Sequence, residues 1–390
     1  MKYSAEQILL LYGLTDADRE LIRLYELHGN AGAEEIGKWF QSVDFEALSA
    51  ECVCMAAVMG AENDYRGVPT ELHPRLKGIL RYHRMLNSGL YAAMCSMTRE
   101  YNKHGIDVLV LKGAAIKTGY QPDFVRPMWD VDILVRPKDF DRALQIAQSL
   151  GYRGSWAPHS IDLKRGSTEA IDLHCVYLRD LRSRKNRDYW PECREVQWNH
   201  ARFFVPERCA LLLQLIVNAH NNFMTHYGTH APLRWIMDMD ALLRDKTPMD
   251  WDKVIHLAKK LQLEAQLMII LAAYDAVLPG RVDTAAIFSK LNHTAEANRM
   301  LRYMERYHQI NHRFRNPSPD CSSVQLAWIH ICWLWLDCRA NNPGSWLHGL
   351  RVFPEYLRGE LRIKSLWHLP VVAIGKFKKR RLERQSKPEN

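Results

Sequence analysis

The pattern of apolar and polar positions separates helical ends of the chain from a central stretch with strand character. Apolar side chains recur at helical spacing over residues 83–104, and Gly105 follows as a typical helix end. Ser4 and Gln7 have the spacing of a capping box at the start of a first helix. Beyond Pro206 the pattern is again helical. Helices are predicted there over residues 207–219, 233–243, 250–261 and 263–278, with helical character continuing over 281–340.

Short apolar runs between these regions predict a small sheet. A short helix at 114–119 and an amphipathic helix at 139–150 interrupt the runs. The order strand, helix, strand, helix and then three strands is typical of a mixed sheet with helices packed on it, which is an α+β fold. Strands are predicted at 106–111, 131–135, 152–156, 161–164 and 170–175. The predicted parts are an N-terminal helical region (1–84), a core (85–205), a C-terminal helical domain (206–345) and an extension (346–390).

Charge is concentrated at the C-terminal end. The chain of 390 residues has a formal net charge of +9, and residues 376–390 contribute seven basic and two acidic groups to it. The body is therefore close to neutral, which argues against a surface that coats nucleic acid along its whole length. We interpret the tail first as a solvated terminus. The functional alternatives are contact with a nucleic-acid backbone or with an anionic membrane.

The cysteines and the N-terminal sequence indicate a reducing compartment, and the apolar segments indicate a chain that does not cross a membrane. The nine cysteines show no zinc spacing, and most lie in apolar runs, as Cys332 and Cys338 do, so we expect small buried side chains. No signal-peptide pattern occurs at the N-terminus, so we expect a cytoplasmic location. The most apolar segment, 324–336, is shorter than the ~20 residues that cross a bilayer, and it predicts a buried helix.

Three aspartates in the predicted strands carry the chemistry. Asp130 and Asp132 precede the apolar run at 133–135, and Asp172 lies in the run 170–175. Residues i and i+2 of a strand face the same way, so Asp130 and Asp132 are expected side by side. Buried carboxylates are costly without cations, and three together repel unless a metal lies between them. The pattern therefore predicts magnesium-dependent phosphoryl chemistry, with Asp172 as the third oxygen ligand.

Phosphate-binding candidates precede the acids. Lys112 and Gly113 end the first predicted strand and open a helix, where free backbone N–H groups favour phosphate and glycine permits close approach. Lys112 adds a point charge, although a lysine at a strand end is usually a solvated surface group. Arg126 could clamp a phosphate with two parallel hydrogen bonds. Its structural alternative is an ion pair with Asp123 or Asp130.

Together these residues resemble the uncharacterised nucleotidyltransferase family of the DNA polymerase β-like superfamily. The resemblance covers about residues 85–245, and its later part includes the segment from Leu233 to Asp238. It implies a small mixed sheet flanked by helices, a nucleoside triphosphate and two divalent ions, Mg²⁺ with Mn²⁺ as the alternative. The motifs are Leu111-Lys112-Gly113, Arg126-Pro-Met-Trp-Asp130-Val-Asp132-Ile-Leu-Val135 and Asp172-Leu-His174. Asp130, Asp132 and Asp172 match the metal-binding catalytic triad, and Gly113 matches the glycine that approaches the phosphates.

One departure from the superfamily bears on function. The residue after Gly113 is usually serine, and here it is Ala114, which offers no hydroxyl to the phosphates. The leading hypothesis is a metal-dependent nucleotidyltransferase that moves a nucleoside monophosphate to an unknown acceptor, a small molecule, a peptide or RNA, and releases pyrophosphate. The alternatives are a non-catalytic module that binds a nucleotide or a partner, and an RNA-directed transferase whose basic tail holds tRNA.

Other polar residues receive structural interpretations. His174 is expected on the face of its strand opposite Asp172, as a packing or orienting histidine. Trp129 is expected to pack, with base stacking as the alternative. Asp238 and Asp240 lie on a predicted helix, where residues two apart do not face each other, so a place in the site is not expected for both, and the alternative is that one of them faces the cleft. Three histidines have no carboxylate at the spacing of a zinc site, so we expect them to line a polar cleft: His220, His226 and His230.

Overall fold

The computed structural model describes most of the first 315 residues. The gaps in this range are residue 28 and residues 122–124, 158–159, 167–168, 179–187, 226–232 and 245–246, and scattered residues are described between 325 and 357. The chain forms two compact units, Met1–Met300 and Leu301–Asn390. The sheet and most of the helices belong to the first unit. The four-part division from sequence stays a prediction, and most of its extension, 346–390, lies outside the described residues.

The N-terminal helices begin at polar caps that the sequence supplies. The Ser4 hydroxyl accepts a hydrogen bond from the backbone N–H of Gln7 at 3.2 Å, and Gln7 Oε1 accepts one from the backbone N–H of Ser4 at 2.9 Å, which confirms the predicted capping box. Thr15 and Asp18 form a second such box. These helices are α1 (Ala5–Leu11), α2 (Asp16–Glu26), α3 (Ala33–Ser42) and α4 (Ala50–Glu62), and the 3₁₀ turns are η1 (Phe45–Ala47) and η2 (Thr70–Leu72).

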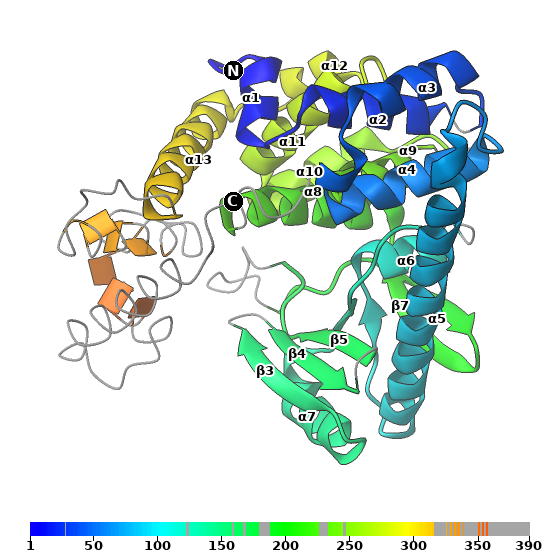
Figure 1. Ribbon diagram of the computed structural model, residues 1–390. Coiled ribbons are helices and arrows are strands. Elements are labelled where there is room, and N and C mark those ends of the chain that lie inside the picture. Colours follow the sequence, from blue (N-terminus) through cyan, green and yellow to red (C-terminus); the bar gives the residue numbers. More distant parts are fainter. Residues whose placement is uncertain are drawn as a thin grey trace. The chain divides into compact units, whose positions relative to one another are not determined.

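A long helix, α5 (His73–Lys103), connects the helical part to the sheet. It begins ten residues before the predicted position because Pro74 fits the first helical turn, where no N–H is required. Its predicted end is confirmed: Gly105 has φ +68°, a left-handed conformation that glycine adopts without strain. Contacts of α5 extend from α4 to strands β5 and β7, so one helix spans both layers (Figure 1).

The sheet has seven strands in the order β3-β4-β5-β2-β1-β7-β6. Strand β2 runs parallel to β5 and β1 runs parallel to β7, while the remaining pairs are antiparallel. The sheet is therefore mixed, and with its flanking helices it gives the α+β fold expected from sequence. The strands are β1 (Leu109–Val110), β2 (Val131–Leu134), β3 (Arg153–Ala157), β4 (Ser160–Arg165), β5 (Glu169–His174), β6 (Cys193–Trp198) and β7 (Ala201–Pro206).

The five predicted strands are present, and the structure adds the hairpin of β6 and β7. Every residue of β2 is buried, as its apolar run indicates. Strand β6 alternates partly buried and exposed positions at the edge of the sheet and has no apolar run, so its sequence carries little strand signal. The intervening helices are α6 (Lys112–Gly119), η3 (Pro137–Asp139) and α7 (Phe140–Ser149).

The N-terminal and C-terminal helices of the first unit pack on each other. Helix α1 contacts α11, and α4 contacts α9, so segments far apart in sequence share one helical layer beside the sheet (Figure 1). Helices were predicted at the positions of α8 to α11, and they are confirmed there. The remaining helices are α8 (Arg208–Thr225), α9 (Leu233–Leu243), α10 (Trp251–Leu261), α11 (Glu264–Val277), α12 (Thr284–Ser289) and α13 (Thr294–Arg315).

The described parts of the chain also bear on the membrane and cysteine expectations. None of the described helices has both the length and the apolarity that crossing a bilayer requires. Much of the predicted helix 324–336 lies outside the described residues. Cys338 is buried as expected, whereas Cys332 is partly exposed.

Candidate active site

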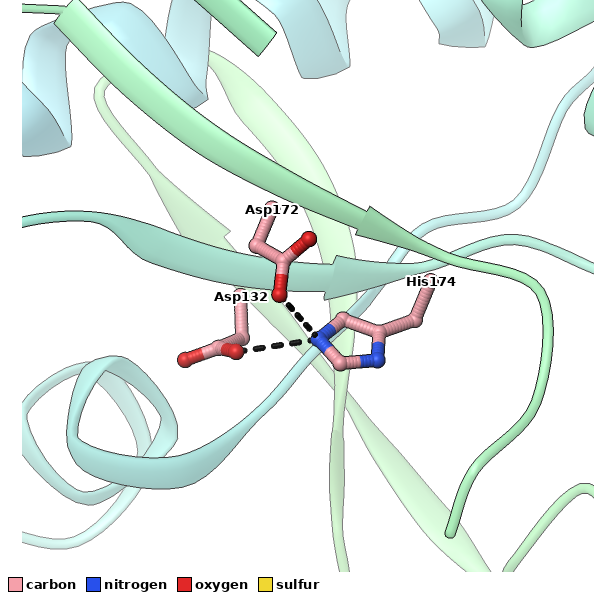
Figure 2. Close-up of side chains that lie close together, drawn as sticks. All are labelled: Asp132, Asp172 and His174. Atoms are coloured by element: carbon pink, nitrogen blue, oxygen red, sulfur yellow. Dashed lines mark hydrogen bonds and ion pairs between the residues drawn. The ribbon is translucent and has the colours of Figure 1, made fainter. Parts of the chain in front are cut away.

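Strand register brings two of the predicted acids together. Asp132 in β2 lies directly opposite Asp172 in the parallel neighbour β5, and Leu134 lies opposite His174. Paired residues of adjacent strands point to the same face of a sheet, and so do residues two apart on one strand. Asp132, Asp172 and His174 therefore share one face. Figure 2 shows their side chains converging.

The histidine lies between the two carboxylates. His174 Nε2 is 2.9 Å from Asp132 Oδ1 and 3.1 Å from Asp172 Oδ2, and all three side chains are largely buried. The expectation that His174 points away from Asp172 is wrong, because residues 172 and 174 are two apart and strand alternation returns the second to the face of the first. The spacing itself carried this information.

Lys112 supplies a second cation to the same acid. Its ammonium group pairs with Asp132 Oδ1, the oxygen that His174 also contacts. Its backbone is left-handed, with φ +50°, and its N–H donates to Oε1 of Gln214 in α8 at 3.2 Å. A non-glycine residue in this region is strained and needs such support. The lysine therefore turns sharply out of β1 and into α6, with its ammonium group at the acids.

Asp130 lies next to this group but outside the strand. Strand β2 begins at Val131, so the alternation that was expected to align Asp130 with Asp132 does not extend to Asp130. Burial, together with the nearby Asp132, raises the pKa of Asp130 to about 6. Asp130 is thus the acid of the group that gives up its charge most readily.

The cations determine the charge of the other two acids. Burial opposes the ionisation of Asp132, but Lys112 and His174 hold its pKa well below the usual range. Burial also opposes the ionisation of Asp172, and His174 outweighs it and lowers the pKa of Asp172. For His174, burial opposes protonation, while Asp172 and Asp132 raise its pKa to about 9. We call Asp130, Asp132, Asp172, His174 and Lys112 the acid cluster.

The acid cluster fits a divalent cation. One ligand atom from each of Asp132, Asp172 and His174 lies within 4.8 Å of the others. Among the described residues, none donates a hydrogen bond to the other oxygen of Asp172, Oδ1, although that atom is buried. A buried carboxylate oxygen without a donor is costly, and a metal ion removes that cost. Two carboxylates and one imidazole form a donor set that such an ion accepts.

A second ionic group, which we call the helical brace, adjoins the cluster. Arg126 Nε is 2.9 Å from Oδ1 of Asp238 in α9, and both side chains are buried. Arg234 in α9 pairs with Glu51 in α4 at 2.9 Å. The Asn87 side chain in α5 donates to the carbonyl of Arg126 at 2.8 Å. The partners expected for Arg126 were Asp123 or Asp130, and the observed partner is Asp238, which was not expected in the site.

Gly113 lies where the two groups meet. A Cβ atom at this position would lie 2.1 Å from Nε and Nη2 of Arg126, so the guanidinium group packs directly on the glycine backbone. Only glycine permits that approach. Lys112 belongs to the acid cluster and Gly113 contacts the brace, so the start of α6 touches both groups.

The remaining candidates fall outside these two groups. Trp129 is 48% exposed and meets His83 edge to face at 5.7 Å, so it does not pack beneath the sheet as expected. His220 is buried, and Asp240 pairs with Arg244 at 2.7 Å. The two other histidines of the expected cleft, His226 and His230, lie outside the described residues.

Comparison with known proteins assigns part of this chain to a family. The family described as uncharacterised nucleotidyltransferase matches residues 54–279. Among solved structures, the chain is similar to an antigenic nucleotidyltransferase-like protein from Paracoccidioides brasiliensis. The identity is 16%, the match covers 52% of this chain and 97% of that chain, and the TM-score is 0.36. No curated protein matches the sequence.

Proposed function

This chain belongs to the uncharacterised nucleotidyltransferase family, and on that premise we propose that it is a metal-dependent enzyme that transfers a nucleoside monophosphate from a nucleoside triphosphate. The acceptor oxygen attacks the α-phosphorus, the bond from that phosphorus to the bridging oxygen breaks, and pyrophosphate leaves. The acceptor belongs to one of three classes: a small molecule, a peptide or RNA.

One observation carries this proposal. Asp132 and Asp172 face each other on adjacent parallel strands, buried, with a third donor 2.9 and 3.1 Å from their oxygens. Lys112 and His174 balance two of the three acids of the cluster, and a divalent cation would neutralise the charge in excess. Phosphoryl transfer uses carboxylates of this kind to hold the cations that neutralise charge on the reacting phosphate.

The metal ligands that we propose are Asp130, Asp132 and Asp172. Two Mg²⁺ ions, or Mn²⁺ as the alternative, would neutralise charge that develops on the phosphates and polarise the reacting oxygens. Asp172 would also help to activate the acceptor hydroxyl. Asp172 lies opposite Asp132 on the neighbouring strand β5. We therefore propose that it binds the second of the two ions and Asp130 the first.

The phosphates would bind at the start of α6. Gly113 allows close approach to the helix N-terminus, whose N–H groups favour anions. Lys112 now pairs with Asp132, and we propose that it exchanges this acid for a phosphate oxygen. Arg126 packs on Gly113, so its charge lies at the same place even while Asp238 holds its Nε. The proposed nucleotide-binding residues are therefore Lys112, Gly113 and Arg126.

Substitution of the acids tests this assignment. Asp130→Asn and Asp132→Asn should each abolish magnesium-dependent triphosphate binding in calorimetry and pyrophosphate release with a responsive acceptor. Asp252→Asn removes an exposed acid from α10 and is the control. Unchanged triphosphate affinity in both site variants, with magnesium present, would show that the site is assigned wrongly.

A binding module is the second candidate, and Ala114 is the observation that favours it. Without a hydroxyl after Gly113 the phosphates lose one contact that the superfamily pattern supplies. Pyrophosphate measured over a panel of acceptors separates the two candidates. Steady turnover supports the enzyme, and stoichiometric nucleotide binding with no pyrophosphate supports the module.

The RNA-directed alternative depends on the basic tail, residues 376–390, which lie outside the described residues. Deletion of this segment should sharply weaken tRNA binding and reduce its dependence on salt. Unchanged binding and salt dependence would exclude the tail as the RNA contact. The cytoplasmic location stays a prediction.

A further inference from the structure

We propose that His174 supplies a nitrogen ligand to the ion held by Asp132 and Asp172, and that this position therefore prefers Mn²⁺ to Mg²⁺. The inference rests on the proposed metal-dependent function and adds a ligand and an ion identity to it. The family resemblance implies carboxylates only, so the histidine comes from the geometry of this chain.

The distances suit a shared coordination sphere. Two neighbouring ligands at 90° around an ion, each about 2.1 Å from it, lie about 3.0 Å apart. His174 Nε2 lies 2.9 Å from Asp132 Oδ1 and 3.1 Å from Asp172 Oδ2. The dashed lines in Figure 2 join these atoms, and the ring nitrogen points at both carboxylates. An ion entering this group meets two oxygens and one nitrogen, and His174 Nε2 releases its proton to solvent as the ion takes the place of that proton.

The alternative is that an incoming ion displaces the histidine. Two cations now contact Asp132 Oδ1, and they differ in mobility. The Lys112 side chain is 22% exposed on a flexible stem, whereas the His174 side chain is 6% exposed. A ring enclosed in close-packed surroundings has little space to rotate away. Lys112 is therefore the cation that leaves, and it has a phosphate to accept it, while His174 remains in place.

The donor set distinguishes Mn²⁺ from Mg²⁺. Mg²⁺ prefers oxygen ligands and keeps several waters, so an imidazole nitrogen contributes little to its binding. First-row transition ions accept imidazole, and Mn²⁺ among them also suits carboxylates. Asp130 lies outside the three-residue group and offers oxygen alone, so a second ion beside it keeps the magnesium preference. The two proposed ion sites therefore differ in their ligands and in the ion that each prefers.

Pulsed electron paramagnetic resonance of bound Mn²⁺ tests the ligand directly. Mn²⁺ added to the metal-free full-length chain should show modulation from a directly coordinated ¹⁴N nucleus. His174→Gln should lose this modulation, and His256→Gln, which changes an exposed histidine on α10, should keep it. An affinity change alone would not suffice, because residues that only orient a ligand also alter metal affinity.

Relative affinity gives a second readout that a purely structural histidine would not alter. The ratio of Mg²⁺ to Mn²⁺ dissociation constants should fall roughly tenfold in His174→Gln. His174→Asp restores three carboxylates and should retain an ion while its preference moves toward Mg²⁺. If His174→Gln fails to fold, the presence or absence of ¹⁴N modulation in the unaltered protein still tests whether a nitrogen binds the ion.

The outcomes separate this inference from the proposed function. Bound Mn²⁺ without ¹⁴N coupling overturns the histidine ligand and leaves the carboxylate site standing. An unchanged affinity ratio in a folded His174→Gln variant overturns the ion preference. Absence of any Mn²⁺ or Mg²⁺ binding, with or without ATP, overturns both proposals.

Discussion

The acid cluster and the helical brace are neighbouring buried ionic groups that meet at the start of α6, yet their charges are balanced differently. In the brace, two arginines face two acids, and α4 and α9 supply three of the four residues. In the acid cluster, three aspartates share one lysine and one histidine. The two arginines of the brace equal its two acids in number, whereas the cluster has three acids and two cations.

This difference separates a group that mainly supports the fold from one that mainly binds a ligand, and Arg126 belongs to the first while it lies beside the proposed phosphate site. Arg126 and Asp238 are both almost fully buried, so their pairing is set by helix packing. Lys112 is more exposed, and the acid cluster has one acid more than it has cations. A group with unsatisfied negative charge beside a mobile cation is suited to accept a metal and a phosphate. The same substitution should therefore have opposite effects in the two groups.

The largest effect is expected in the brace. Asp238→Asn leaves the buried Arg126 guanidinium without its acid, and breaking a buried pair in this way costs about 3–5 kcal/mol. Burial raises the pKa of Asp238 as it does that of Asp130, but here the unpaired arginine dominates because a guanidinium cannot lose its charge. Urea unfolding should show this loss, whereas Asp252→Asn, which breaks only an exposed pair with Lys290 on the surface of α10, should cost no more than about 1 kcal/mol. Replacing both partners, as Arg126→Met with Asp238→Leu, should recover much of the loss. If Asp238→Asn were neutral, the brace would not stabilise the fold.

The sequence predicts most of the elements around the acid cluster, but it does not predict the pairing within the helical brace. The apolar run of β2 and the glycines that end α5 and α7 predict the elements around Asp132, because burial and left-handed turns leave local signals. His174 was predictable too, since it lies two residues after Asp172. The partner of Arg126 was not, because Asp238 lies 112 residues later and only the packing of α9 beside α4 and α6 brings it near. Strand β6 has no apolar run to recognise, whereas β7 has one at Phe203–Val205 that was missed.

Gly113 tests the junction of the two groups. In Gly113→Ala the new methyl group would lie 2.1 Å from the Arg126 guanidinium, which Asp238 prevents from moving freely. Forcing atoms into such a packed place costs about 1–3 kcal/mol. The matched control is Gly78→Ala in α5, where a Cβ meets nothing within 4 Å, and there alanine should stabilise the helix by about 0.5–1 kcal/mol.

Thermal or urea unfolding of the two alanine variants measures the change in stability, which should be a loss for Gly113→Ala and a gain for Gly78→Ala. A Gly113→Ala protein as stable as the unaltered chain would mean that Arg126 moves aside at little cost. The junction would then not couple the brace to the phosphate site.

The smallest effect, and the opposite sign, is expected for Asp130→Asn in the acid cluster. Burial and the other acids raise the pKa of Asp130 from 3.8 to about 6, so the folded state holds its proton more tightly than the unfolded state. Its charge therefore destabilises the fold increasingly as pH rises through this window, and asparagine removes that cost. In chelator, the variant should exceed the unaltered protein by about 1–2 kcal/mol near pH 7, after allowance for solvent screening. This gain should vanish as pH falls to about 4, where Asp130 is largely protonated in the folded state. A variant that is less stable at neutral pH would place Asp130 with the brace, as an acid that supports the fold.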